Sequence, residues 1–254
     1  MKILYFTSTG NCLYVAKKIG GELLSIPQLS KNKIYEINDD IVGIISPVYM
    51  WDIPRPVQKY LKIVKIKANY IFVLMTYGSV QVGAIGLIKK LLENNNIQIH
   101  YSNIIKMVDN YLPIFEIEKQ LKTKNDDDID LKINSIVADI YNKKNNILKP
   151  LFLQYIISKI YSSLNLTDKF MNKAVKLFYI NNYCDKCNIC HKVCPMGNIT
   201  GIDKPEYSNK CEFCLSCIHN CPKNAIHLKN ERSDKRFRNK KINLVDIINS
   251  NNQI

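Results

Sequence analysis

The sequence predicts an α/β fold with a doubly wound parallel sheet, joined to a small cysteine-rich domain near the C-terminus. Two observations predict the sheet: three short apolar runs of strand-forming residues, and a helix-like pattern after each of them. A third observation sets the second domain apart, since eight of the nine cysteines fall within residues 184–221 of the 254-residue chain.

The first predicted strand covers residues 2–6, and a hydroxyl-rich loop separates it from a helix-like pattern over residues 12–19. The loop consists of Thr7, Ser8, Thr9, Gly10 and Asn11. A helix N-terminus offers unpaired N–H groups, hydroxyls add donors, and glycine permits close approach, which together suit a phosphate group. The same residue types also cap ordinary helices, so the loop alone leaves a plain helix start open.

Two more strands are predicted over residues 41–46 and 70–75, because both are continuous apolar runs of the kind buried in parallel sheets. Helix-like patterns follow over residues 57–64 and 82–92. Ligands bind such sheets at the C-terminal ends of the strands. The candidate binding residues at these two ends are Pro47, Val48, Tyr49, Trp51, Thr76, Tyr77 and Gly78.

The three loops resemble those of the flavodoxin family. Residues 7–11 are similar to the loop that binds the FMN phosphate, and residues 47–54 to a loop beside the flavin ring. Residues 76–78 stand where the second ring-contacting loop belongs. The resemblance covers about residues 1–145 and implies the strand order 2-1-3-4-5 and a bound flavin mononucleotide.

Two residues depart from the flavodoxin pattern. Cys12 stands where the family usually has threonine or serine, and a thiol is a weaker donor to phosphate. Trp51 stands near a position where many relatives have glycine, and we expect it to contact the flavin or a substrate. Tyr49 and Tyr77 either flank the ring or pack between helix and sheet. Cys12 could be reactive at a helix N-terminus, but burial as a small apolar residue is the preferred interpretation.

Residues 146–181 are predicted to form a helical linker between the domains. Before it, Asn125 begins a polar break that caps a helix over residues 129–141. Residues 151–161 are apolar but too short to span a membrane, which needs about twenty apolar residues. Apolar residues then recur at helical spacing over residues 170–178. We expect these helices to pack the two domains together, with a membrane-surface or partner-docking role as the alternative.

Each half of the cysteine-rich segment reads C-x2-C-x2-C-x3-C-P, the run typical of bacterial iron–sulfur proteins. Groups of four thiolates suit zinc or iron–sulfur clusters, but zinc sites commonly use two C-x2-C pairs separated by a longer loop. Disulfides would be an alternative in a secreted chain. The N-terminus shows no signal-peptide pattern, so we expect a cytoplasmic location. The sequence therefore predicts two [4Fe–4S] clusters.

In such runs the fourth cysteine ligates the other cluster. The predicted ligands are Cys184, Cys187, Cys190 and Cys221 for one cluster, and Cys211, Cys214, Cys217 and Cys194 for the other. Residues 183–228 resemble two-cluster bacterial ferredoxins, which implies a small α+β domain of (βαβ)2 type and low-potential electron transfer. The first run departs from that family at residues 196–199, where a Pro-x-x-Ala-Ile pattern is frequent; the second keeps it at residues 222–226.

The formal net charge is +14, but only four of the 36 basic residues are arginine. Specific recognition of nucleic acid relies on arginine forks, so no nucleic-acid partner is expected. The densest basic segment, residues 232–241, lies in a predicted basic C-terminal tail of residues 231–254. A solvated tail is the preferred interpretation, and docking to an acidic redox partner or to the N-terminal domain is the alternative.

The chain is thus predicted to fuse a flavodoxin-like FMN domain (residues 1–145) to a ferredoxin domain (residues 182–230). The predicted function is electron transfer between FMN, two clusters and a redox partner protein. The alternative is a flavin-dependent reductase of a small molecule, fed by its own clusters. No catalytic residue is predicted, since three of the four histidines lie in the predicted ferredoxin domain. A cluster-containing sensor would need an output element such as a helix-turn-helix, and we recognise none.

Overall fold

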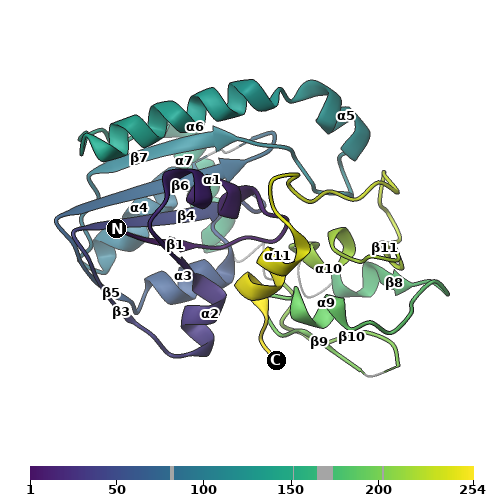
Figure 1. Ribbon diagram of the computed structural model, residues 1–254. Helices are drawn as coiled ribbons and strands as arrows, with labels where there is room; N and C mark the ends of the chain where they lie inside the picture. The colour runs from purple at the N-terminus through teal and green to yellow at the C-terminus, as the bar shows by residue number, and fades with distance from the viewer. Residues whose placement is uncertain (81–82, 151, 165–173, 202) are drawn as a thin grey trace.

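The computed structural model describes residues 1–80, 83–150, 152–164, 174–201 and 203–254. Its main sheet has five strands, which are β1 (Lys2–Tyr5), β2 (Glu22–Ser25), β4 (Ile41–Pro47), β6 (Tyr70–Tyr77) and β7 (Tyr101–Lys106). The strand order is β2-β1-β4-β6-β7, and every neighbouring pair is parallel (Figure 1). Numbered within this sheet, the order is 2-1-3-4-5, so the predicted parallel sheet and its strand order are confirmed.

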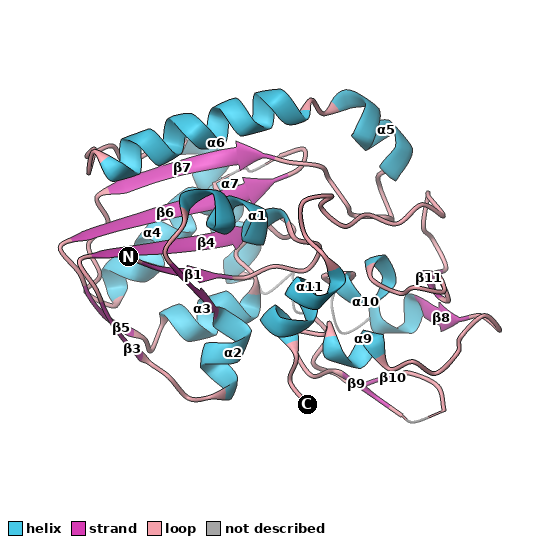
Figure 2. Cartoon of the chain, viewed as in Figure 1, coloured by secondary structure: helices cyan, strands magenta, loops and turns pink. Residues whose placement is uncertain are grey.

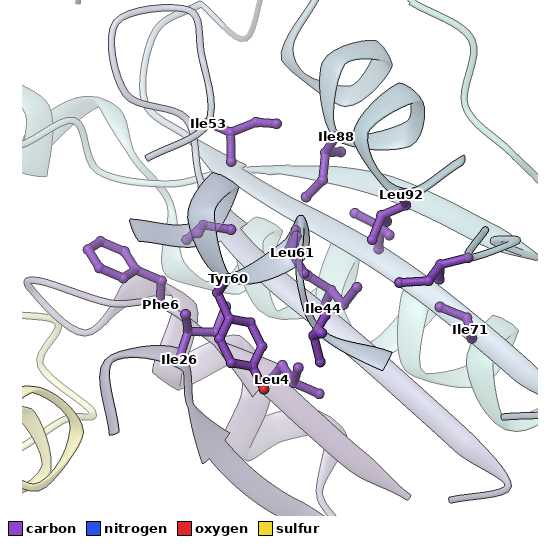
Figure 3. Close-up of a cluster of buried hydrophobic side chains, with 14 of the residues drawn as sticks. Leu4, Phe6, Ile26, Ile44, Ile53, Tyr60, Leu61, Ile71, Ile88 and Leu92 are labelled. Atoms are coloured by element: carbon purple, nitrogen blue, oxygen red, sulfur yellow. The ribbon is translucent and has the colours of Figure 1, made fainter. Parts of the chain in front are cut away.

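Both faces of the sheet are buried, because successive residues of a strand point to opposite sides. In β1, Leu4 belongs to one buried cluster, whereas Ile3 and Tyr5 belong to the cluster on the other side. Figure 3 shows the cluster around Leu4, in which Ile44 of β4 and Tyr60 lie close to one another. This two-sided burial explains why β4 and β6 read as continuous apolar runs.

Helices cover both faces of the sheet. The cluster around Leu4 is completed by α2 (Ile26–Lys31), α3 (Arg55–Leu61) and α4 (Ala84–Asn94). The opposite cluster is completed by α1 (Asn11–Ile19) and α6 (Asp126–Tyr141). Further elements before the cysteine-rich half are α5 (Ile117–Thr123) and α7 (Phe152–Ser163), which packs on α4 (Figure 2). Two short strands, β3 (Glu36–Asn38) and β5 (Lys65–Lys67), form a separate parallel pair.

The predicted helices are found, with differences at the linker. The helix expected over residues 82–92 is α4, although Val82 itself lies outside the described residues. The apolar segment of residues 151–161 forms most of α7, with Leu151 again outside them. Among the residues that the structure describes, no helix is both long and apolar enough to cross a bilayer.

The helical pattern expected over residues 170–178 is not continued to its end. Phe170 lies outside the described residues, Val175–Leu177 forms a single 3-10 turn, and Phe178 begins β8 (Phe178–Ile180). The helix prediction is therefore wrong at Phe178, because its backbone pairs antiparallel with β11 (Ile226–Leu228). Tertiary pairing outweighs local spacing for such a short segment.

The cysteine-rich half consists of short elements. Besides the pair of β8 and β11, it contains β9 (Ile199–Thr200), which is antiparallel to β10 (Glu206–Tyr207), and the helices α9 (Ile189–Lys192) and α10 (Ser216–His219). The ferredoxin-type arrangement and the domain boundaries expected for this region stay predictions.

The C-terminal residues are folded, so the expectation of a solvated tail is wrong. Phe237, Ile242 and Ile247 are buried, and α11 (Leu244–Asn251) begins with a capping box at Asn243. α11 contacts both α2 and α9, and in Figure 1 it lies, in yellow, between the sheet and the cysteine-rich half. The basic residues drew attention in the sequence, but the apolar side chains spaced among them supply the buried area that orders this segment.

Candidate functional site

The C-terminal ends of the parallel strands border a cavity of about 520 Å³. The loops after β1, β4 and β6 were predicted to meet there, and all thirteen candidate residues except Gly10 line the cavity. These twelve are Thr7, Ser8, Thr9, Asn11, Cys12, Pro47, Val48, Tyr49, Trp51, Thr76, Tyr77 and Gly78. The structure therefore brings the three loops to one place; their binding role stays a prediction.

The loop after β1 presents hydroxyls and the start of α1 to this cavity. Thr7, Ser8 and Thr9 are almost fully buried, and Thr7 Oγ1 accepts a hydrogen bond from the N–H of Gly10 at 3.1 Å. Gly10 has a φ of +98°, and a Cβ at this position would lie 2.9 Å from Ile242 Cβ. The first N–H groups of α1 have no acceptor within the helix. The loop therefore has free donors and requires glycine.

The loop after β4 makes a tight two-residue turn. Tyr49 and Asp52 exchange two backbone hydrogen bonds, of 3.0 and 2.9 Å, across Met50 and Trp51. Both central residues have positive φ, +49° and +65°. This conformation costs a side-chain-bearing residue roughly 1–3 kcal/mol. The strained turn holds the indole of Trp51 at the cavity with 44% of its surface exposed.

Tyr49 connects the first two loops. Its hydroxyl donates to Ser8 Oγ at 2.9 Å, and its ring meets Phe6 edge-on, with the ring centroids 6.1 Å apart. Burial raises the pKa of Tyr49 well above its ordinary value, and the nearby Cys214 thiolate would raise it further. The phenol therefore stays a hydrogen-bond donor. Tyr49 packs against the buried cluster around Leu4 and also lines the cavity, and its contact with a flavin ring stays a prediction.

A fourth loop, after β7, lines the cavity and was missed in the sequence. Its lining residues are Met107, Val108, Asp109, Asn110, Tyr111, Ile114 and Phe115. Gly78 lets the carboxyl group of Asp109 come close, since a Cβ on Gly78 would lie 2.2 Å from Asp109 Oδ2. Burial raises the pKa of Asp109. β7 is less uniformly apolar than β4 and β6, but its C-terminal end could have been expected at the same edge of the sheet.

Cys12 is a buried thiol. It is 1% exposed, and its Sγ lies 3.2 Å from Thr76 Oγ1. Burial raises the pKa of Cys12 to about 12, so the thiol stays protonated near neutral pH. The interpretation of Cys12 as a small buried residue is confirmed, and the alternative of a reactive thiol is wrong.

The eight cysteines of the two runs gather in two groups of four. The outer group, Cys184, Cys187, Cys190 and Cys221, lines one small cavity, and the inner group, Cys194, Cys211, Cys214 and Cys217, lines another. The groups coincide with the two predicted ligand sets, including the exchange of the fourth cysteine. All nine cysteines are free thiols, which argues against the disulfide alternative.

The two runs repeat the same backbone turns. In each run the residues on either side of the second cysteine have positive φ, as does the third residue after the last cysteine. These residues are Lys186, Asn188 and Gly197 in the first run, and Phe213, Leu215 and Asn224 in the second. Left-handed residues bend the chain sharply, so that neighbouring thiols converge. Such strain in non-glycine residues is typical of functional sites.

Donors point at several of the cysteine sulfurs. The backbone N–H groups of Asn198 and Ala225 lie 3.3 Å from the sulfurs of Cys194 and Cys221. Hydrogen bonds of this kind stabilise thiolates that ligate clusters. Without a metal, burial raises the pKa of Cys190 to about 12. Thiols packed together in this way become thiolates most readily when a metal compensates their charge.

The inner group lies against the large cavity. Cys214 and Leu215 line both the large cavity and the inner group's own cavity. In the outer group, by contrast, Cys187 is exposed to solvent. The two groups therefore differ in what surrounds them, although their sequences have the same spacing.

An ion pair with a buried carboxylate joins the end of the loop after β4 to the inner group. Arg55, at the start of α3, donates through Nε to Glu212 Oε2 at 2.7 Å and through its backbone N–H to Oε1 at 2.8 Å. Its Nη2 also donates to the carbonyl of Cys211. Glu212 is 1% exposed. Glu212 lies between two cysteines of the inner group. The ion pair therefore holds the second cysteine run against the end of the loop after β4.

A further group of possible metal ligands, His227, Glu231 and Asp234, lies outside the two cysteine groups. Arg236 Nη2 lies 3.0 Å from Glu231 Oε1 and 2.9 Å from His227 Nδ1. A guanidinium in this position supplies the positive charge that the carboxylate needs, so His227 and Glu231 are explained as parts of an ionic network with Arg236, whereas Asp234 is exposed.

Comparisons with known proteins give only distant likenesses. No protein-family model matches the chain, and no curated protein matches it. The chain is similar to a flavoprotein in complex with FMN from Lactobacillus acidophilus NCFM, with 15% identity, a TM-score of 0.30, and coverage of 41% of this chain and 91% of that one.

It is also similar to a flavodoxin from the domain Archaea, with 12% identity, a TM-score of 0.30, and coverage of 54% of this chain and 99% of that one. For the flavodiiron protein from Giardia intestinalis the identity is 15%, the TM-score 0.32, and the coverage 56% and 37%. Scores of this size are too low to bear on function, which therefore rests on the geometry of the site.

Proposed function

We propose that the chain is an electron-transfer protein in which FMN occupies the large cavity and two [4Fe–4S] clusters occupy the cysteine groups. FMN supplies a centre that exchanges electrons singly or in pairs, whereas each cluster exchanges one. The proposal is carried by one observation: Cys214 lines both the large cavity and the cavity of the inner group. A cluster held by the inner group would then adjoin the flavin.

Several features support FMN in the large cavity. The phosphate would be held by the hydroxyls of Thr7, Ser8 and Thr9 and by the free N–H groups at the start of α1. The flavin ring would lie among the loops after β4 and β6, where Trp51 and Tyr77 supply apolar surface. Cys12 has a thiol where a hydroxyl would serve the phosphate, and its sulfur is paired with Thr76 Oγ1.

Three features support clusters in the cysteine groups: the partition into two sets of four, the repeated left-handed turns, and the N–H groups directed at sulfur. Zinc also accepts four thiolates, but it would need no sulfide. The exposed position of Cys187 suggests that electrons enter or leave through the outer group, where a redox partner protein would dock.

Metal, sulfide and flavin analysis of anaerobically purified chain tests this function. The proposal expects about eight iron, about eight sulfide and one FMN per chain, with flavin and iron–sulfur absorption in one visible spectrum. About two zinc without sulfide would contradict the clusters. A chain that carries iron and sulfide but binds no added FMN would contradict the role of the large cavity.

One observation favours the second candidate, a reductase of a small molecule. The cavity extends past the predicted flavin loops to Ile114 and Phe115, and its carboxyl group, Asp109, has a raised pKa and could supply a proton. Oxidation of the cluster-fed flavin by a small molecule, at a rate that falls in Asp109→Asn while FMN stays bound, would favour this candidate. A reduced flavin that no added small molecule oxidises would favour the carrier.

A further inference from the structure

The loop between β1 and α1 receives hydrogen bonds from the far end of the chain. The carbonyl oxygen of Thr7 accepts a hydrogen bond from Asn251 Nδ2 at 2.9 Å, from a residue 244 positions away. The carbonyl oxygen of Thr9 accepts one from the backbone N–H of Asn239 at 2.8 Å. A buried backbone carbonyl needs such partners. Two of the three hydroxyl-bearing residues of the loop thus depend on the C-terminal segment.

The third carbonyl, that of Ser8, depends on the cysteine-rich half. It accepts hydrogen bonds from Ser216 Oγ at 3.0 Å and from Asn220 Nδ2 at 3.2 Å. Both donors belong to the chain around α10 and are almost fully buried. Ser216 directly precedes Cys217, and Asn220 directly precedes Cys221. Each donor is therefore the neighbour of a predicted cluster ligand.

These bonds determine which way the loop's N–H groups point. In a trans peptide the C=O and the following N–H point in opposite directions. When the carbonyls of Thr7 and Ser8 are tied to the second half of the chain, the N–H groups of Ser8 and Thr9 are turned away from it. Ser8 and Thr9 line the large cavity, where these donors would meet a phosphate.

We propose that α10 shapes the loop between β1 and α1, so that FMN and the clusters strengthen each other's binding. The inference rests on the proposed function and adds a regulation of the same site. Ligation to iron would fix Cys217 and Cys221, which would hold Ser216 and Asn220 against Ser8. A loop that is already ordered loses less conformational entropy when its ligand binds. Linkage makes the effect reciprocal, so bound FMN helps the chain to retain iron.

The first test measures FMN affinity of the cluster-loaded full chain. The double variant Ser216→Ala/Asn220→Ala removes both side-chain donors to Ser8, and we expect its FMN affinity to fall about tenfold, as for the loss of two neutral hydrogen bonds. The control is Asn181→Ala, which removes hydrogen bonds to His227 and Tyr183 in the same half of the chain but none to the loop. Affinity equal to wild type in the loaded double variant would overturn the proposal.

The second test measures the reciprocal effect as the rate of iron loss to a chelator. In wild type and in Asn181→Ala, saturating FMN is expected to slow the loss of iron. In the double variant FMN is expected to have little effect on that rate. A merely structural role of α10 would change iron loss with and without FMN alike. Slowing by FMN that is as large in the double variant as in wild type would therefore overturn the proposal.

The outcomes also separate this inference from the function on which it rests. A wild-type chain that binds no FMN, or holds no iron and sulfide, contradicts the proposed function. A wild-type chain that binds both, but loses iron at the same rate with and without FMN, contradicts only the coupling. If the double variant loads little iron, Ser216→Ala alone is used, with an expected loss of about threefold for one hydrogen bond.

Discussion

The inner and outer cysteine groups have the same spacing and the same backbone turns but different surroundings. Cys214 of the inner group shares the wall of the large cavity, and Glu212 beside it is tied to Arg55. Cys187 of the outer group is exposed, and Lys186 beside it pairs with Asp203 at the surface. The two copies of the motif thus have different surroundings, since one is turned towards the large cavity and the other towards solvent.

Replacing one cysteine in each group should reveal the largest difference between the inner and outer groups. We expect Cys214→Ala and Cys187→Ala each to lower the iron content from about eight to about four per chain. Cys214→Ala should weaken FMN binding more than Cys187→Ala does, since Cys214 also lines the large cavity. Iron analysis and FMN titration measure both effects. Equal flavin loss in the two variants would remove the distinction between the groups.

The two ion pairs provide a second contrast, in stability. Glu212 is 1% exposed, so Arg55→Met leaves its carboxylate buried without the guanidinium and should cost about 3 kcal/mol of unfolding free energy. Lys186→Met breaks a pair whose side chains are 58% and 84% exposed, and should cost at most about 1 kcal/mol. Urea unfolding of the cluster-loaded chain compares them. Similar costs would mean that the inner run is not held by Arg55.

Alanine substitutions of two glycines at opposite ends of α1 test the proposed role of the loop after β1. Gly10 and Gly20 both have positive φ, +98° and +85°, so alanine at either position should cost about 1–3 kcal/mol of stability. Only Gly10→Ala brings a Cβ against Ile242 and disturbs the loop, whereas the space around Gly20 is open to 3.8 Å. We expect FMN affinity to fall in Gly10→Ala and to stay unchanged in Gly20→Ala, by fluorescence titration.

Cys12 should show the smallest effect near neutral pH, in contrast to the cluster ligands. Burial raises its pKa from 9.0 to about 12, so the folded state favours the protonated thiol. Its contribution to stability is therefore complete below pH 9 and declines as the pH rises from 9 towards 12. Alkylation of the native chain by iodoacetamide at pH 8 should spare Cys12. Rapid labelling of Cys12 without unfolding would contradict its burial.

The sequence was sufficient where chemistry depends on local spacing. The apolar runs of β1, β4 and β6 predicted the parallel sheet, and the three loops at their ends predicted twelve residues of the cavity wall. The crossing of Cys194 and Cys221 between groups also followed from the spacing.

What the sequence could not provide depends on contacts between distant residues. Nothing near Asn220 or Asn239 in the sequence indicates that they hold the loop after β1. The basic residues around Phe237 concealed a folded segment, because charge density says little about which neighbouring side chains become buried. The helix expected at Phe178 failed for the same reason, since its pairing with Leu228 of β11 decides its conformation.

The most direct test of the account is the rate at which a reduced two-cluster ferredoxin, added as electron donor, reduces bound FMN under anaerobic conditions. Wild type should be reduced quickly, because on the proposed path electrons enter at the outer group and reach the flavin through the inner group. Cys187→Ala, with FMN and the inner cluster retained, should be reduced much more slowly. Equal rates in Cys187→Ala and wild type would contradict the proposed path.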